Sequence, residues 1–225
     1  MRSKKPLRVM VLAGCVTAVL AGVLATLYAC LHHVPTFYHE ALTADPAAQQ
    51  RASQQMIRQA AAMQNQVRRE GPWQAVFTAD EINGWLAVEL PNSRGHLLPP
   101  ELSDPRLRIE PGRLTAACQA VIRGVRSIVS LEVSVYMDSP NVLALRIRRA
   151  RVGAIPWPLD RVLRATGAAM ARAELPIEWR QTAGDPVALV TLRPGLVGHG
   201  RTIRVESIRL EQGQITLTGS TEREK

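Results

Sequence analysis

The chain has 225 residues, a formal net charge of +9 and 46% hydrophobic residues, enough to bury a core of its own. Four positive charges lie within the first eight residues, and removing them leaves +5 spread along the chain. Such a dispersed balance excludes an obvious nucleic-acid footprint, so no nucleic-acid partner is expected. Cys118 is the only cysteine after residue 31, which excludes an internal disulfide in that part of the chain.

Residues 9–31 are an apolar run of 23 residues that contains no charged residue, Asn, Gln or Pro. As a helix this run would be about 35 Å long, enough to cross a bilayer. The basic residues 2–8 precede it, which places the N-terminus in the cytoplasm under the positive-inside rule. The sequence therefore predicts a single-pass signal anchor in the cytoplasmic (inner) membrane of a bacterial cell, with the domain outside in the cell envelope.

Cys30 is the last residue of a possible lipoprotein signal. The segment Leu27-Tyr28-Ala29-Cys30 loosely matches a bacterial lipobox. Tyr28 is bulky at a position where that signal usually has a small residue. The simpler interpretation is that Cys30, like Cys15, is a small apolar residue of the run. Lipidation at Cys30 is kept as the alternative.

Residues 45–70 are predicted to contain a helix, because Asp45 can cap it and Pro46 suits its first position. Its apolar positions fall at spacings of four, three and four, a narrow stripe formed by Met56, Ala60, Met63 and Val67. The helix should end before Gly71. We expect a juxtamembrane stalk, which could also contact an envelope protein or a second copy of the chain.

A second helix is predicted from Thr78, which can cap it while Glu81 reaches back in a capping box. Its apolar face comprises Ile82, Trp85 and Leu86. Pro91 is expected to end this helix.

From Arg106 onward the period of the hydrophobic pattern changes from 3.6 to 2, which indicates antiparallel strands with one apolar face. A turn is expected at 138–141. A further helix over 159–173, ended by Pro176, presents Val162, Leu163 and Met170 on one face. The strands are predicted at 106–109, 112–121, 127–137, 142–152, 177–179, 187–192, 202–210 and 214–218.

Together these elements predict an α+β fold, in which a transmembrane helix and a juxtamembrane helix precede a mostly antiparallel sheet packed on one or two helices. The predicted organisation is a cytoplasmic flank, an anchor, a stalk, an extracytoplasmic domain and a tail, at residues 1–8, 9–31, 32–72, 73–221 and 222–225.

Recognised catalytic motifs are absent from the sequence, including HExxH, GxSxG, the P-loop and paired CxxC. His96 and His199 lack a third ligand at a motif spacing, so no metal site is expected. We therefore expect a protein that is not an enzyme and uses no cofactor.

Arg146, Arg148, Arg149 and Arg151 form the one local run of charge. Arg146 and Arg148 should share a strand face, whereas Arg149 breaks the alternation and indicates a bulge or the end of the strand. A solvated sheet face explains such a run. The alternative is that Arg146 and Arg148 contact anionic lipid headgroups.

The segment Thr78-Ala79-Asp80-Glu81-Ile82-Asn83-Gly84-Trp85-Leu86 resembles the T-x-x-E-I-N-x-x-L opening of several bacterial envelope domains. Over residues 76–220 the order of elements is similar to the YpmS-like family of single-span membrane proteins. The resemblance rests on the strand and turn at 143–156, the helix at 159–173 and Leu175-Pro176-Ile177-Glu178-Trp179. It implies a tubular lipid-binding type of fold, in which a curved antiparallel sheet wraps a long helix and leaves an apolar groove.

Two functions are consistent with these features of the sequence. The first is a membrane-anchored domain that binds lipid or another apolar ligand in the envelope, with the ligand contacted by Ile82, Trp85, Leu86, Val162, Leu163 and Met170. The alternative is a non-catalytic envelope scaffold or protein-interaction module. The resemblance implies no catalytic residue for either.

Overall fold

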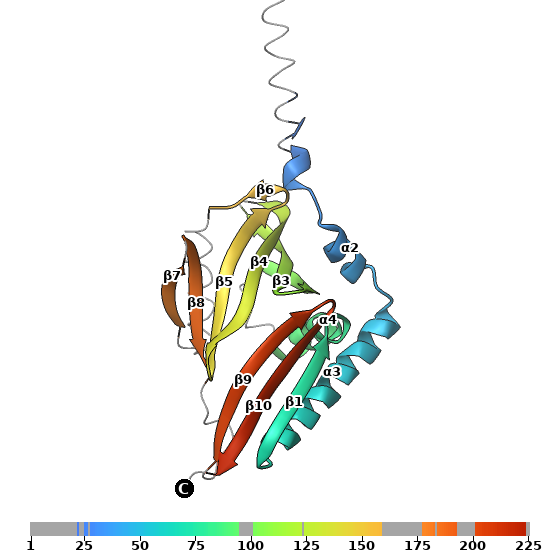
Figure 1. The fold of residues 1–225 in the computed structure, drawn as a ribbon. Helices are drawn as coiled ribbons and strands as arrows, with labels where there is room; N and C mark the ends of the chain where they lie inside the picture. The colour runs from blue at the N-terminus through green and yellow to red at the C-terminus, as the bar shows by residue number, and fades with distance from the viewer. Residues whose placement is uncertain are drawn as a thin grey trace, which may run out of the picture.

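The computed structural model describes residues 22, 25–26, 28–94, 101–122, 124–158, 177–182, 184–192 and 201–223. The named helices in this part of the chain are α2 (Thr36–Leu42), α3 (Pro46–Val67) and α4 (Ala79–Arg94). In chain order, strand β1 lies between α3 and α4, and strands β2 to β10 follow α4. Figure 1 shows α3 running alongside β1, with α4 at the junction of two sheets.

The strands form a three-stranded sheet, in the order β1-β10-β9, and a seven-stranded sheet, in the order β2-β3-β4-β5-β8-β7 with β6 paired to β5. Every pairing is antiparallel, as the sequence predicts. The small sheet consists of β1 (Gly71–Thr78), β9 (Arg201–Glu211) and β10 (Gln214–Arg223). The large sheet consists of β2 (Leu102–Glu110), β3 (Arg113–Ile122), β4 (Val125–Ser139), β5 (Val142–Val152), β6 (Ile155–Pro156), β7 (Ile177–Thr182) and β8 (Asp185–Thr191).

The predicted α+β class is wrong, because the fold is mostly β: 54% of the described residues lie in strands and 31% in helices. Strand β1, at Gly71–Thr78, is absent from the predicted strands, since two of its eight residues are Gly and Pro. Strands β4 and β10 also run longer than their apolar cores. The helix predicted at 159–173 lies outside the described residues.

The predicted membrane anchor is also corrected: among the described residues, no helix is both long and apolar enough to cross a membrane. Of the apolar run, residues 22, 25–26 and 28–31 belong to the described residues. The remainder of 9–31 lies outside the described residues. The single-pass topology, the signal anchor and the inner-membrane localisation are therefore not retained.

The predicted starts of the helix within 45–70 and of the helix after Thr78 are confirmed. Asp45 caps α3 by accepting from the backbone N–H groups of Ala47 and Ala48, and the helix ends at Val67. The capping box is complete, because the Thr78 N–H donates to Glu81 Oε2 at 2.8 Å and the Glu81 N–H donates to Thr78 Oγ1 at 3.2 Å.

The expected end of the second helix at Pro91 is wrong, since α4 continues through Pro91 to Arg94. Proline removes one backbone donor and normally ends or kinks a helix. Here the helix continues for four residues from Pro91. In this last turn Asn92 Nδ2 donates to the Val88 carbonyl at 2.7 Å.

Helices α3 and α4 cross closely at Gly84. A Cβ atom at this position would lie 2.7 Å from Ala52 Cβ, from the Gln49 carbonyl oxygen and from the Ser53 backbone nitrogen. Ser53 is fully buried at the same crossing. Because two of these neighbours are backbone atoms that cannot move aside, only glycine fits this crossing.

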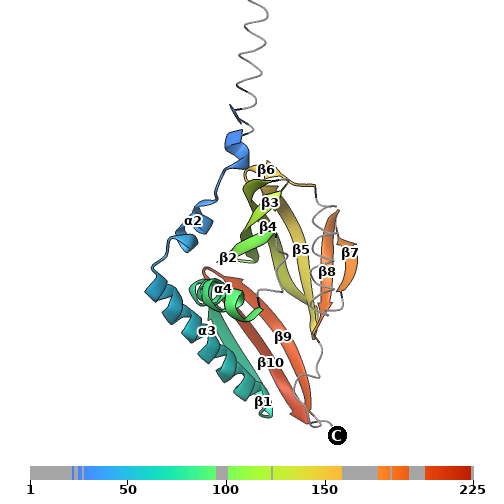
Figure 2. The ribbon, with the colours of Figure 1, turned by 180° about the vertical axis from the view of Figure 1, so that it is seen from behind.

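Two asparagine side chains join the parts of the fold by acting as short strand partners. Asn83 of α4 donates to the Leu107 carbonyl and accepts from the Leu107 N–H, both at 2.8 Å, at the free edge of β2. Asn141, in the β4–β5 turn, donates to the Ile203 carbonyl at 3.0 Å and accepts from the Val205 N–H at 2.7 Å. Figure 2 shows α4 beside β2 at this junction.

The tips of two hairpins also meet. The Gly112 N–H of the β2–β3 turn donates to the Leu210 carbonyl, and the Gly213 N–H of the β9–β10 turn donates to the Ile109 carbonyl, both at 3.0 Å. Strand β9 therefore contacts the β2–β3 turn near its end and the β4–β5 turn near its start. These bonds fix the small sheet against the hairpin ends of the large one.

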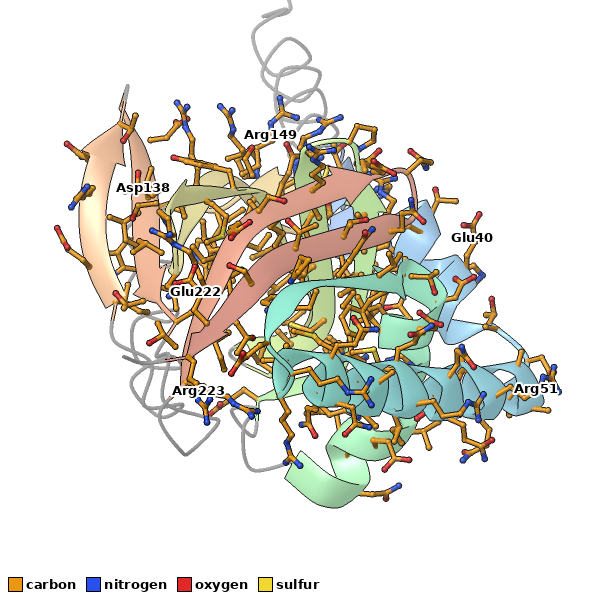
Figure 3. The ribbon with its side chains drawn as sticks, turned by 60° about the horizontal axis from the view of Figure 1, so that its bottom comes forward. Glu40, Arg51, Asp138, Arg149, Glu222 and Arg223 are labelled. Carbon is orange, nitrogen blue, oxygen red and sulfur yellow. The ribbon has the colours of Figure 1, made fainter. Side chains whose placement is uncertain are left out.

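Charged side chains of both signs lie around the outline of the molecule. Figure 3 shows Glu40 and Arg51 on the side of α2 and α3, with Asp138 and Glu222 on the side of the strands. This distribution agrees with the dispersed charge of the sequence.

Candidate functional site

The large sheet presents one continuous apolar face. Residues directly opposite one another in antiparallel strands share a face, so the register assigns the side chains. The pairs Leu114–Val133 and Val133–Ile147 carry the row from β3 across β4 to β5. The apolar face comprises Leu107, Ile109, Leu114, Ala116, Leu131, Val133, Val135, Leu143, Leu145 and Ile147.

This apolar face is not uniformly covered. Ile109 and Ile147 are 1% and 2% exposed, so they belong to the packed core. Leu114, Leu131 and Leu145 are only half-buried, although they lie on central strands. Large aliphatic side chains at the centre of a sheet are normally fully buried, so a partly covered face of this kind is where an apolar ligand could add contact.

The predicted ligand-contacting helix faces are placed only in part. Ile82, Trp85 and Leu86 are half-buried on α4, which packs against α3, β1 and β2. Val162, Leu163 and Met170 lie outside the described residues. The structure therefore does not bring the two groups together, and their role in ligand contact stays a prediction.

Helix α3 packs against α4 and β1, and its predicted stripe is half-buried at Met56, Ala60 and Met63 and buried at Val67. Between α3 and β1 lies an open groove of about 440 Å³, lined by Met63, Gln66, Gln74 and neighbouring residues. Strand β1 is an edge strand of the small sheet.

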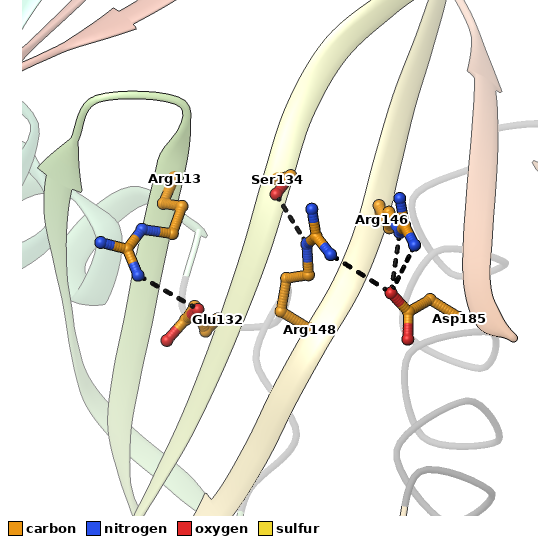
Figure 4. A network of polar contacts seen from close by, with 6 residues as sticks. All are labelled: Arg113, Glu132, Ser134, Arg146, Arg148 and Asp185. Carbon is orange, nitrogen blue, oxygen red and sulfur yellow. Dashed lines mark hydrogen bonds and ion pairs between the residues drawn. The ribbon is translucent and has the colours of Figure 1, made fainter. Parts of the chain in front are cut away.

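Arg146 and Arg148 share a strand face, as predicted, and both engage Asp185 (Figure 4). Arg146 donates through Nε at 2.8 Å and Nη2 at 2.7 Å to Asp185 Oδ2, and Arg148 Nη1 lies 3.3 Å from the same oxygen. Arg148 Nε also donates to Ser134 Oγ at 3.1 Å. A carboxylate held by two guanidinium groups ties β5 to β8, so both arginines already have an anionic partner.

The break in alternation at Arg149 is a β-bulge, one of the two structures that the sequence predicts. Glu132 of β4 pairs with Arg149 and the next residue, Val133, pairs with Ile147, which leaves Arg148 as the extra residue of β5. The bulge turns Arg149 onto the face of Arg148, and both are exposed while Ile147 is buried. Figure 4 shows the ion pair of Glu132 with Arg113 on the same face.

Cys30 lies where the N-terminal segment meets the large sheet. Its carbonyl accepts from the Ala154 N–H at 2.8 Å, and the Leu31 carbonyl accepts from Ser127 Oγ at 2.6 Å. Gly153 has a φ of +58°, and a Cβ there would overlap the Cys30 carbonyl oxygen. Lipidation of Cys30 stays a prediction.

Within the described residues, no three His, Cys, Asp or Glu side chains are grouped as a metal site would require. His96 and His199 lie outside the described residues. Whether the chain catalyses a reaction stays open to test.

Cys118 is a residue of strand β3. Burial raises the pKa of its thiol from 9.0 to about 11. Because the thiolate is the reactive form, a rise of this size lowers the thiolate fraction about 100-fold at neutral pH. We expect iodoacetamide to alkylate Cys118 at least about 100-fold more slowly in the folded protein than in urea. Peptide-resolved mass spectrometry of timed samples measures this ratio, and equal rates in both states would contradict the raised pKa of this partly buried thiol.

No family model, no curated protein and no solved structure matches this chain. The resemblance to the YpmS-like family therefore stays a prediction from the sequence. Sequence reasoning also misses a small polar pocket beneath α2, because its residues come from four strands and α2 and share no local motif.

Proposed function

We propose that the protein is a binding module for a lipid or another apolar ligand, held against the apolar face of the large sheet. The observation that carries the proposal is the half-buried state of Leu114, Leu131 and Leu145 at the centre of that face. An acyl chain laid there would remove further apolar surface from water, at about 25 cal/mol per Å².

A larger side chain on the apolar face of the large sheet should weaken ligand binding. We expect the full-length chain to bind a fluorescent palmitate analogue saturably, and Leu131→Trp to bind it about tenfold more weakly because the indole takes the ligand's space. Titration followed by fluorescence emission measures both affinities.

Thr202→Trp is the matched control, because Thr202 is exposed on β9 of the small sheet. It adds the same side chain away from the apolar face and should leave the affinity unchanged. Equal binding by wild type and by Leu131→Trp, in samples with the same melting temperature, would refute the proposal.

A second candidate function is a protein-interaction module, and the groove between α3 and β1 favours it. An edge strand beside a groove can accept an extended segment as an additional strand, where its edge is open. Light scattering on the full chain would support self-association by a dimeric mass. A monomeric mass would exclude self-association through this groove, and its partner would then have to be a different protein.

A further inference from the structure

A second site lies on the opposite, polar face of the large sheet, under the start of α2. The described residues line there a half-open pocket of about 180 Å³. We call it the arginine pocket; its sheet residues are Arg108, Thr115, Ser130, Glu132, Arg149 and Arg151.

Strand register builds this pocket. Arg108, Thr115, Glu132 and Arg149 stand directly opposite one another in a single row across β2, β3, β4 and β5. Ser130 and Arg151 belong to the next row. The bulge at Arg148 is what brings Arg149 onto this face, since strict alternation from Ile147 would place it on the apolar face.

Helix α2 closes the pocket from above. Tyr38 is fully buried against Ala117 and Ile128, and its hydroxyl donates to the Asp104 carbonyl at 2.8 Å. Burial raises the pKa of Tyr38 to about 12, so this hydroxyl stays a neutral donor at physiological pH. The adjacent Phe37 therefore stands fixed over the sheet, with the Arg108 guanidinium 5.0 Å from its ring centroid.

The charge of the pocket is unbalanced. Its lining has three guanidinium groups and one carboxylate. The carboxylate of Glu132 is directed to Arg113, at 3.7 Å, and Arg108 is paired with Glu110 at 3.1 Å. Among the described residues, no carboxylate lies within ion-pairing distance of Arg149 or Arg151.

Thr115 is the second, independent sign of a ligand. The residue is 9% exposed, and its Oγ1 atom is buried without a hydrogen-bond partner among the described residues. A buried hydroxyl without a partner is costly. Because this atom is closed to water in the structure, an acceptor from outside the chain reaches it when a neighbouring side chain of the pocket moves aside. Guanidinium groups and hydroxyl donors around a small cavity match the oxygens of a tetrahedral oxyanion.

We propose that the arginine pocket binds a phosphate group, carried either by a soluble phosphomonoester or by a lipid headgroup. At roughly 30 Å³ per water, the pocket holds about six waters, which is room for one phosphate group and a few waters. Arg149 and Arg151 supply its counter-charge, and Thr115 donates a hydrogen bond to one of its oxygens. This site is on the opposite face from the proposed apolar ligand and does not depend on it.

The first test is calorimetric titration of the full-length chain with inorganic phosphate and with glycerol 3-phosphate. We expect saturable binding that weakens at least about tenfold in the double variant Arg149→Gln/Arg151→Gln. The matched control, Arg204→Gln/Arg209→Gln on β9, removes the same charge from the small sheet and should leave binding unchanged. Equal weakening in both double variants would overturn the proposal, because it would indicate general electrostatic attraction.

Thr115→Val separates a ligand contact from a structural role. This change removes the hydroxyl and keeps the shape, so we expect weaker phosphate binding together with a melting temperature, measured without phosphate, that is unchanged or raised. A lowered melting temperature with unchanged phosphate affinity would show that the hydroxyl serves the fold, against the proposal.

Vesicles distinguish the two sources of the phosphate. Sedimentation with phosphatidic acid vesicles, compared with phosphatidylserine vesicles of equal surface charge, tests the lipid headgroup. Binding to phosphatidic acid that is lost in Arg149→Gln/Arg151→Gln, without binding to soluble phosphates, assigns the lipid source. Binding of glycerol 3-phosphate assigns the soluble source, and no arginine-dependent binding in either experiment refutes the site.

Discussion

Replacing Gly84 with valine should destabilise the protein by about 3 kcal/mol, the upper part of the usual range for overpacking. The valine side chain would have to displace the α3 backbone at Gln49 and Ser53, each 2.7 Å from the position of its Cβ atom. The separation of the two helices would increase, and the packing of α3 on α4 would be lost. Urea unfolding followed by far-ultraviolet circular dichroism gives the change in the free energy of unfolding.

Ala61→Val is the control for the helix propensity of valine, since Ala61 is exposed on α3. It should cost only about 0.6 kcal/mol. A Gly84→Val protein no less stable than Ala61→Val would show that the two helices do not cross as closely as described.

Replacing Asn141 with alanine should cost about 3 kcal/mol. The change removes two hydrogen bonds and places alanine, which tolerates a left-handed conformation less well than asparagine, at this position. Asn141 has a φ of +63°, a region that asparagine tolerates better than alanine. Without its amide, the Ile203 carbonyl and the Val205 N–H lose their partner on the β4–β5 turn. Thermal and urea unfolding measure the loss.

Two further variants separate the contribution of the hydrogen bonds from that of the backbone conformation. Asn141→Gly keeps the backbone conformation easily and loses only the amide bonds, so we expect about 2 kcal/mol. Asn141→Asp keeps the acceptor for the Val205 N–H but places a carboxylate oxygen against the Ile203 carbonyl, so its stability should also fall. If the glycine and aspartate variants were as stable as wild type, Asn141 would not be what joins β9 to the large sheet.

Local sequence signals predict local structure well. Asp45 with Pro46, and Thr78 with Glu81, mark the helix starts, because capping depends on residues within one turn. The strand at 142–152 is predicted with its observed bounds, including the irregularity at Arg149, because alternation records which side chains face the core.

Features that depend on distant contacts are not predictable in the same way. Strand β1 contains Gly71 and Pro72 and forms because β10 pairs with it, more than 130 residues later. The ties made by Asn83 and Asn141 depend on strand edges elsewhere in the chain. The polar pocket depends on the register of four strands, which no short motif encodes.

The error in the fold class has a related cause. The described strands extend past the apolar segments that predict them, for example in β10, where polar residues up to Arg223 pair with β9. Pairing with a neighbouring strand determines where such strands end, and the hydrophobic pattern alone does not.

The central claim is that the apolar face of the large sheet holds an apolar ligand. Native mass spectrometry of the full-length chain, purified without detergent and followed by organic extraction, tests it most directly. We predict a stoichiometric adduct of lipid size on wild type and on Thr202→Trp, and a much smaller occupancy on Leu131→Trp. A folded wild-type protein with only its apo mass, and no uptake of added palmitate, would contradict the claim.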